Sequence, residues 1–97
     1  MCTIVRGIIA TLCRLLRYEK HNSMTIQEKV GKTIIKLRKE RGMSQETFAY
    51  ESGIDRRYMS DIENGKRNIS LDILERVADK LEIKLSEFFL EVENINE

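Results

Sequence analysis

Residues 45–62 read QETFAYESGIDRRYMSDI, and this stretch decides the fold. Ala49 is small enough for two crossing helices to approach closely, and Gly53 tolerates the positive φ that a tight turn needs. A second helix would begin at Arg56, and three apolar side chains can lock it to the first: Ile54, Met59 and Ile62. The spacing predicts a helix-turn-helix whose second helix stands out from the body and is able to enter a major groove.

Polar capping residues divide the sequence around this unit into short helices. Thr25 and Glu28 have the spacing of a capping box, and the helix that follows ends at Gly42. The other predicted N-caps are Ser44, Asp55, Ser70 and Ser86. Because apolar residues recur at helical spacing after each cap, residues 26–93 predict five helices packed as a compact all-α bundle.

The segment 1–23 is separate from the compact domain predicted at 24–97. Its apolar residues cover one half of a helical wheel, opposite three arginines: Ile4, Val5, Ile8, Ile9, Leu12, Leu15 and Leu16 against Arg6, Arg14 and Arg17. The pattern fits an additional amphipathic helix docked on the bundle or on a second subunit, or one that lies on a membrane surface. It equally fits a translated upstream stretch, because Met24 would be a sensible start for the domain.

Composition excludes several classes of protein. The chain has 97 residues, of which 41% are apolar and 34% charged, as expected of one helix-rich domain and not of a disordered tail or a layered-sheet enzyme. Two Cys and one His are too few for a metal site or a catalytic centre, so we expect no metal, no cofactor and no enzymatic activity. The longest apolar run, 8–13, is too short to cross a membrane. The two thiols are typical of a cytoplasmic protein.

Charge is divided unequally along the chain although the total is only +1. Residues 1–25 and residues 26–69 each carry a net charge of +3, whereas residues 70–97 carry −5. This uneven charge would allow a basic face to meet a polyanion while an acidic face turns away from it. Small domains also show such asymmetry by chance.

The sequence resembles the Cro/C1-type (phage repressor-like) helix-turn-helix family over about residues 30–89. The matching residues are Val30-Gly31, Ile34, Leu37-Arg38, Gly42-Met43-Ser44-Gln45, Ala49, Gly53-Ile54, Tyr58-Met59-Ser60-Asp61-Ile62-Glu63-Asn64-Gly65-Lys66-Arg67, Leu71, Leu74, Ala78, Leu81 and Leu85-Ser86-Glu87-Phe88-Phe89. Within the family, residues 48–60 with Arg67-Asn68 look most like the controller proteins of restriction–modification systems. The resemblance implies a lambda-repressor-like fold and a sequence-specific regulator of transcription that binds double-stranded DNA.

The residues predicted to contact bases lie on the helix that begins at Arg56. Arg56 and Arg57 open it, although positive charge at a helix N-terminus is unfavourable, and an arginine can donate two hydrogen bonds to guanine. Tyr58 can pack on a sugar or a thymine methyl, or can simply prop the helix. Ser60 can bond a base or phosphate, and Asp61 can accept from cytosine or orient an arginine.

The residues predicted to contact phosphates are Ser44, Gln45, Lys66, Arg67 and Asn68. Free backbone amides at the start of a helix suit a phosphate, and the family uses the glutamine at the position of Gln45 for this contact or as a brace for the next helix. Ser44 is equally well explained as a plain cap. The resemblance also implies that Arg38 and Glu63 form a partly buried, structural salt bridge.

Proteins of this kind bind inverted repeats as two-fold dimers, so we expect a homodimer. The predicted interface consists of Ile83, Leu85, Phe88, Phe89 and Val92, unless the two phenylalanines only cap the core of the monomer. No small-molecule ligand and no membrane are expected. The alternative is a phage-type repressor or antitoxin-like regulator that also binds a protein through residues 1–20.

Overall fold

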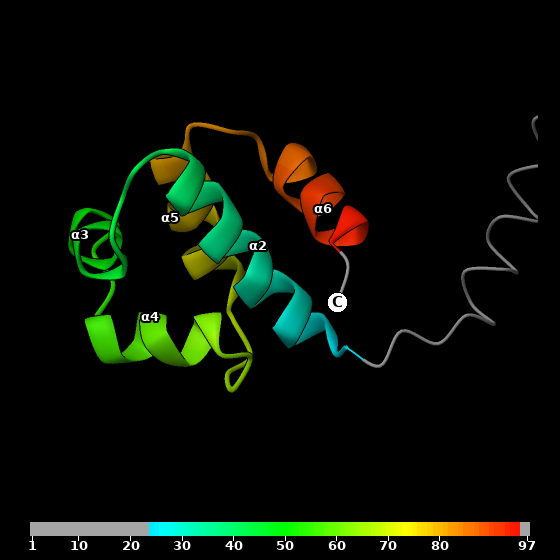
Figure 1. Ribbon diagram of the computed structural model, residues 1–97, viewed down its shortest axis with the longest axis horizontal. Coiled ribbons are helices and arrows are strands. Elements are labelled where there is room, and N and C mark those ends of the chain that lie inside the picture. The colour runs from blue at the N-terminus through cyan, green and yellow to red at the C-terminus, as the bar shows by residue number, and fades with distance from the viewer. Residues whose placement is uncertain (1–23, 96–97) are drawn as a thin grey trace, which may run out of the picture.

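The computed structural model describes residues 24–95, which form five α-helices and no strand (Figure 1). In chain order they are α2 (Ile26–Glu40), α3 (Gln45–Glu51), α4 (Arg56–Glu63), α5 (Leu71–Leu81) and α6 (Leu85–Asn94). The prediction of an all-α fold is confirmed. The predicted N-terminal helix lies outside the described residues.

Four of the five predicted N-caps are present, and each satisfies backbone amides that the first helical turn leaves free. The Thr25 hydroxyl accepts from the amide of Glu28, whose carboxylate accepts from the amide of Thr25. The remaining three caps are Ser44, which accepts from Thr47, Asp55, which accepts from Arg57 and Tyr58, and Ser70, which accepts from Ile73. Local sequence therefore decides where α2, α3, α4 and α5 begin.

The start of α6 differs from the prediction. Ser86 was expected to be its N-cap but lies inside the first turn, because the helix begins at Leu85 and Lys84 holds the capping position. The carboxylate of Glu87 accepts a 2.9 Å hydrogen bond from the backbone amide of Lys84. This contact is the reciprocal half of a capping box, in which the N3 carboxylate accepts from the backbone amide of the N-cap residue.

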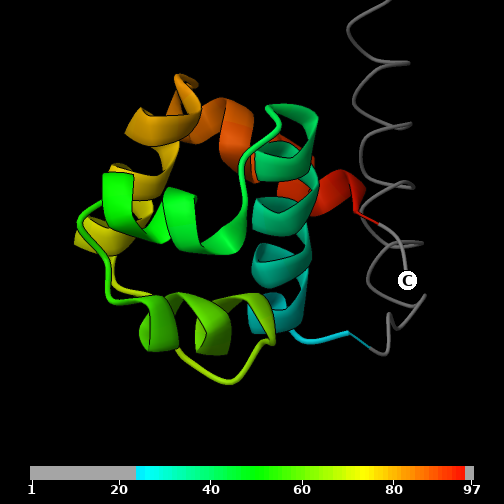
Figure 2. The same cartoon turned by 60° about the vertical axis from the view of Figure 1, so that its left-hand side comes forward.

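All five helices contribute to one core, and α2 packs against each of the other four (Figure 2). The largest fully buried side chains include Ile34, Phe48, Met59, Val77 and Phe88, one from each helix. Gly31 lets α2 and α4 approach closely, because an added Cβ would lie only 2.5 Å from the carbonyl oxygen of Ile62. The backbone of α4 is thus held directly against α2.

The packing order separates two outer surfaces. α4 packs on α2 and α3, whereas α6 packs on α2 and α5 (Figure 1). The exposed side of α4 and the exposed side of α6 are therefore different faces of the domain.

Candidate nucleic-acid interface

The turn between α3 and α4 has the geometry that the sequence predicts. Gly53 has φ +70°, a left-handed conformation that a side chain would strain. The amide of Ile54 donates a 2.9 Å hydrogen bond to the carbonyl of Ala49, which is buried at the crossing. This closed turn fixes the start of α4, at Arg56, beside α3.

Two arginines stand exposed at that N-terminus, Arg56 and Arg57. The nearest ion-pair partner of Arg56 is Glu46, at 3.9 Å, and both side chains remain mostly in solvent. Within residues 24–95, no carboxylate lies within ion-pair distance of the Arg57 guanidinium. A hollow of about 300 Å³ opens beside the two arginines, lined by Gln45, Arg56, Arg57, Ser60 and Asp61. An open site next to unpaired positive charge suits an anionic ligand.

The other residues predicted to contact bases are more constrained. Ser60 and Asp61 are half-buried, and Tyr58 packs partly against the core. Arg67 reaches across from the following loop, with its guanidinium carbon 5.3 Å from the centre of the Tyr58 ring. Its Nε lies 3.4 Å from an Asp61 oxygen. Tyr58, Asp61 and Arg67 thus form one cluster on the exposed side of α4.

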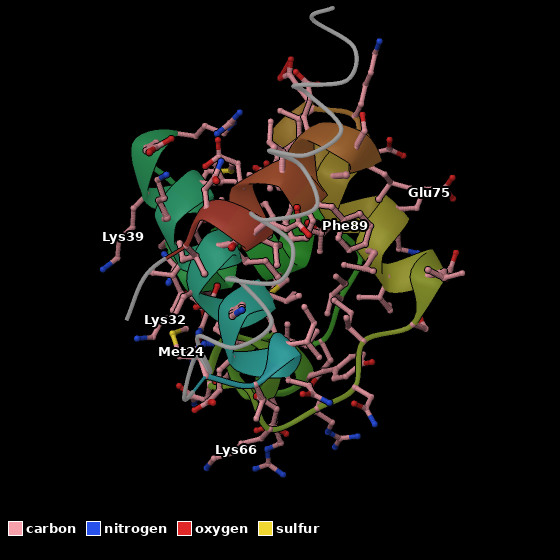
Figure 3. The ribbon with its side chains drawn as sticks, turned by 90° about the vertical axis from the view of Figure 1, so that its right-hand side faces the viewer. Met24, Lys32, Lys39, Lys66, Glu75 and Phe89 are labelled. Atoms are coloured by element: carbon pink, nitrogen blue, oxygen red, sulfur yellow. The ribbon has the colours of Figure 1, made fainter. Side chains whose placement is uncertain are left out.

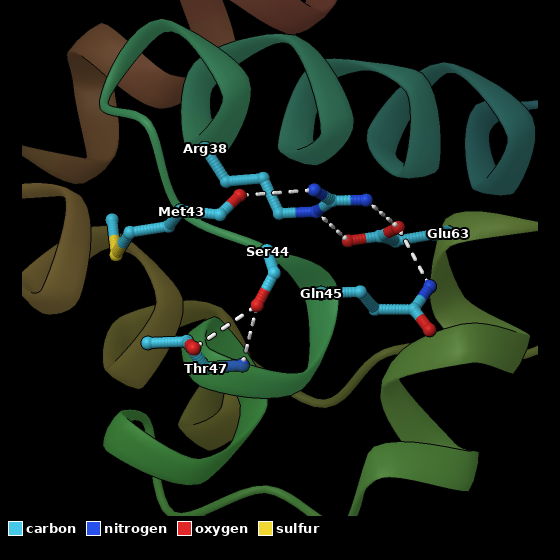
Figure 4. Close-up of polar contacts among 6 residues, drawn as sticks. All are labelled: Arg38, Met43, Ser44, Gln45, Thr47 and Glu63. Carbon is cyan, nitrogen blue, oxygen red and sulfur yellow. Dashed lines mark hydrogen bonds and ion pairs between the residues drawn. The ribbon is translucent and has the colours of Figure 1, made fainter.

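A buried polar network fixes α4 relative to α2 and α3 (Figure 4). Arg38 donates from Nε and Nη2 to the two carboxylate oxygens of Glu63, at 2.7 and 2.9 Å, and from Nη1 to the carbonyl of Met43. The hydrogen bond to Glu63 raises the pKa of Arg38 above its usual value. Gln45 donates to the same carboxylate at 2.9 Å. The Arg38–Glu63 pair is therefore structural, and Gln45 braces α4.

Gln45 keeps hydrogen-bonding capacity beyond this brace. Its amide nitrogen has a second N–H, its carbonyl oxygen is an acceptor, and the residue lines the hollow described above. Ser44 serves as the cap of α3, and its hydroxyl also lies 3.0 Å from that of Thr47.

The loop after α4 lies against the start of α2. The Gln27 side chain donates to the Asn68 side chain, and a Cβ added at Gly65 would collide with Glu28. Lys66 and Arg67 are exposed beside this contact. Sequence reasoning missed Gln27, because nothing local marks a hydrogen bond between residues 41 positions apart.

The five predicted interface residues do not form one surface. Phe88 and Val92 are 0% and 1% exposed in the core of the monomer, so neither has surface to offer a second subunit. Ile83 is partly buried against that core. Leu85 and Phe89 are exposed, as is Leu90 beside them, and Figure 3 shows Phe89 on the α6 side of the domain, well away from Lys66. For the phenylalanines, one caps the core and the other faces outward.

Residues 24–95 contain neither a metal-binding cluster nor a membrane-spanning helix. No group of three His, Cys, Asp or Glu side chains is arranged to hold a metal ion. No helix there has the length and apolar character to cross a membrane.

The sequence model of a protein family described as helix-turn-helix matches residues 34–88, which is more than half of the chain. The chain therefore belongs to this family of Cro/C1 type, whose members are DNA-binding transcriptional regulators and not enzymes. The predicted resemblance is confirmed.

Several similar proteins are controller proteins of restriction–modification systems. The chain is 49% identical to control protein C.MunI of Mycoplasma sp over 69 residues, which cover 70% of this chain and 93% of the relative. It is similar to the restriction–modification controller protein C.AhdI from Aeromonas hydrophila, with TM-score 0.63, 41% identity, and 65% and 96% of the two chains covered. It also resembles controller protein C.Esp1396I, solved as a tetramer with its natural 35 base-pair operator, with TM-score 0.67, 38% identity and coverage of 74% and 95%. The chain is thus a regulator that resembles restriction–modification controller proteins.

Proposed function

We propose that this protein is the controller of a restriction–modification system, acting in the cytoplasm as a homodimer on an inverted-repeat operator. The observation that carries the proposal is the free N-terminus of α4, where Arg56 and Arg57 stand exposed beside an open hollow. Similarity to controller proteins, one of them solved on its operator, supports the choice within the family.

In this proposal α4 lies in the major groove. Arg56 and Arg57 donate to base edges, and Ser60 bonds a base or the adjacent phosphate. Ser44, Gln45, Lys66 and Asn68 hold the backbone on either side, because they lie at the start of α3 and on the loop after α4. These phosphate contacts fix the register of α4 in the groove.

The second subunit is proposed to pack on the exposed side of α6. Leu85, Phe89 and Leu90 are 37%, 39% and 59% exposed, three large apolar side chains on one short helix, and Leu85 and Phe89 are neighbours on its surface because they are four residues apart. Contiguous apolar surface on a small domain marks an interaction site. Since α6 and α4 present different faces, a dimer joined through α6 leaves both copies of α4 free for DNA.

The experiment that tests the function is selection of bound sites from random DNA by the full-length protein. We expect an inverted repeat whose half-site centres lie about one helical turn, or a multiple of it, apart. Affinity for that site should fall steeply as salt rises, because bound phosphates release counterions. Recovery of no preferred sequence would contradict the proposal. The controller role is tested by whether the selected operator lies upstream of the genes of a restriction–modification system.

A further inference from the structure

Arg67 belongs to the loop after α4 in sequence but to the exposed side of α4 in space. Its guanidinium lies over the ring of Tyr58, and its Nε contacts the carboxylate of Asp61 at 3.4 Å. Asp61 also lines the hollow shared with Arg56, Arg57 and Ser60. The guanidinium therefore sits at the edge of the surface proposed to face the bases.

The backbone holds the loop in this position from both sides. The amide of Lys66 donates to the carbonyl of Asp61 at 2.9 Å, and the amide of Gly65 donates to that of Ile62, so the chain folds back over the last turn of α4. Gly65 has φ +74°, the left-handed conformation that such a reversal needs. On its other side the loop is bonded to α2 through Asn68 and Gln27.

The contacts of Arg67 leave the two Nη groups of its guanidinium available for a further partner. Within residues 24–95, the hydrogen bond of the Arg67 side chain is made by Nε to Asp61, which leaves the N–H donors of the two Nη groups uncommitted. An arginine can use such donors to place two parallel hydrogen bonds on O6 and N7 of a guanine. Restraint by Tyr58 and Asp61 lowers the side-chain entropy that this contact would otherwise cost. The guanidinium in turn neutralises the Asp61 carboxylate, which phosphates would repel.

We propose that Arg67 reads a guanine in the operator as a third arginine of the α4 surface, and that Tyr58 and Asp61 act through it as positioning residues. The proposal rests on the proposed function, because it assumes that α4 lies in the major groove. It gives Arg67 a base to read in place of the phosphate contact that its loop position suggested.

The first test is Arg67→Lys, which keeps the charge and removes the planar fork. Titration against the operator selected by the unchanged protein should show about a tenfold loss, whereas affinity for random DNA should stay within about twofold. Site selection by the variant should lose one guanine in each half-site. Equal weakening on operator and random DNA would identify a phosphate contact and overturn the proposal, as would no change on either.

The second test separates positioning from direct contact. Asp61→Asn should relax preference at the same base pair as Arg67→Lys, and the double variant should lose little more than either single variant, because the two residues act as a unit. Glu75→Gln is the matched control, since it removes one negative charge from an exposed site on α5. Preference lost at a different base pair, or additive losses, would overturn the role of Asp61. Thermal unfolding of each variant checks that the fold is intact.

Failure of this inference can be told from failure of the proposed function. If the unchanged protein selects no site, the function itself is wrong. If it selects an inverted repeat and Arg67→Lys leaves its base preference intact, only the reading role of Arg67 is wrong.

Discussion

Arg57 occupies a position where a positive charge is unfavourable within the domain alone. It stands in the first turn of α4, where the helix dipole presents its positive end, and no carboxylate of residues 24–95 pairs with it. We expect Arg57→Ala to raise the free energy of unfolding slightly, by up to about 1 kcal/mol, and to remove about 1–3 kcal/mol of discrimination at one base pair of each half-site. Competition titrations with single-base operator variants measure this. Equal loss on operator and random DNA would contradict a base contact.

Lys66 should behave differently, because a flexible ammonium group on an exposed loop suits a phosphate. We expect Lys66→Ala to weaken binding to all sequences together and to reduce the slope of log K against log salt by about one per subunit. Lys39→Ala serves as the control, because it removes the same charge near the C-terminal end of α2, whereas the loop of Lys66 contacts the N-terminal end of that helix (Figure 3). An equal change of slope in both variants would show that only the net charge matters.

At the scale of elements, the close approach of α2 and α4 depends on one missing side chain. A Cβ at Gly31 would lie 2.5 and 2.6 Å from the carbonyl oxygens of Ile62 and Glu63, which are backbone atoms that cannot turn aside. We expect Gly31→Ala to lower the free energy of unfolding by about 1–3 kcal/mol or more, because the helices must separate. Denaturant unfolding measures the loss. Lys32→Ala, exposed on the same helix, should stay within about 0.5 kcal/mol of the unchanged protein, and an equal loss there would remove the steric explanation.

Local signals allowed the helices to be predicted from sequence, and long-range packing explains where the predictions were wrong. Thr25, Ser44, Asp55 and Ser70 cap their helices because a capping side chain acts on amides two or three residues away. The cap of α6 was misplaced because the helix begins one residue before Ser86, at Leu85, with Lys84 at the N-cap and its amide bonded to the Glu87 carboxylate. Phe88 and Val92 were assigned to a subunit interface, since periodicity does not tell which apolar stripe faces the core of the same monomer.

The candidate site also has a part that could be predicted from local sequence and a part that depends on long-range packing. The sequence predicts that Arg56 and Arg57 open an exposed helix, because the cap and the turn that place them are adjacent in the chain. The cluster of Arg67 with Tyr58 and Asp61 depends on a loop that folds back and is bonded to α2 at Gln27, and no pattern in the sequence encodes that contact. Residue types at a site are therefore more predictable than the contacts that orient them.

For the whole molecule, the burial of α6 decides which substitution can test the dimer. Phe88 is fully buried, so a charge there would unfold the monomer and say nothing about subunits. Phe89 is 39% exposed, and we expect Phe89→Asp to give folded monomers in sedimentation velocity and weaker operator binding. Tyr50→Asp places the same charge on α3, at a side chain 86% exposed, and should remain dimeric. A dimeric Phe89→Asp variant would contradict an interface on α6.

The last prediction concerns the boundary between residues 1–23 and the domain. α2 is capped by Thr25 and Glu28, both inside the domain, so its first turn needs nothing from the preceding residues. We therefore expect a chain that begins at Met24 to keep its unfolding free energy, its dimer and its selected operator. Removal of 1–23 also removes three arginines, one lysine and one glutamate, a net charge of +3. These residues directly precede the first turn of α2, where Gln27 is hydrogen-bonded to Asn68 in the loop that carries Lys66 and Arg67. A lower salt slope with unchanged base preference would fit loss of this charge, whereas loss of the dimer would show that the apolar stripe of 4–16 belongs to the interface.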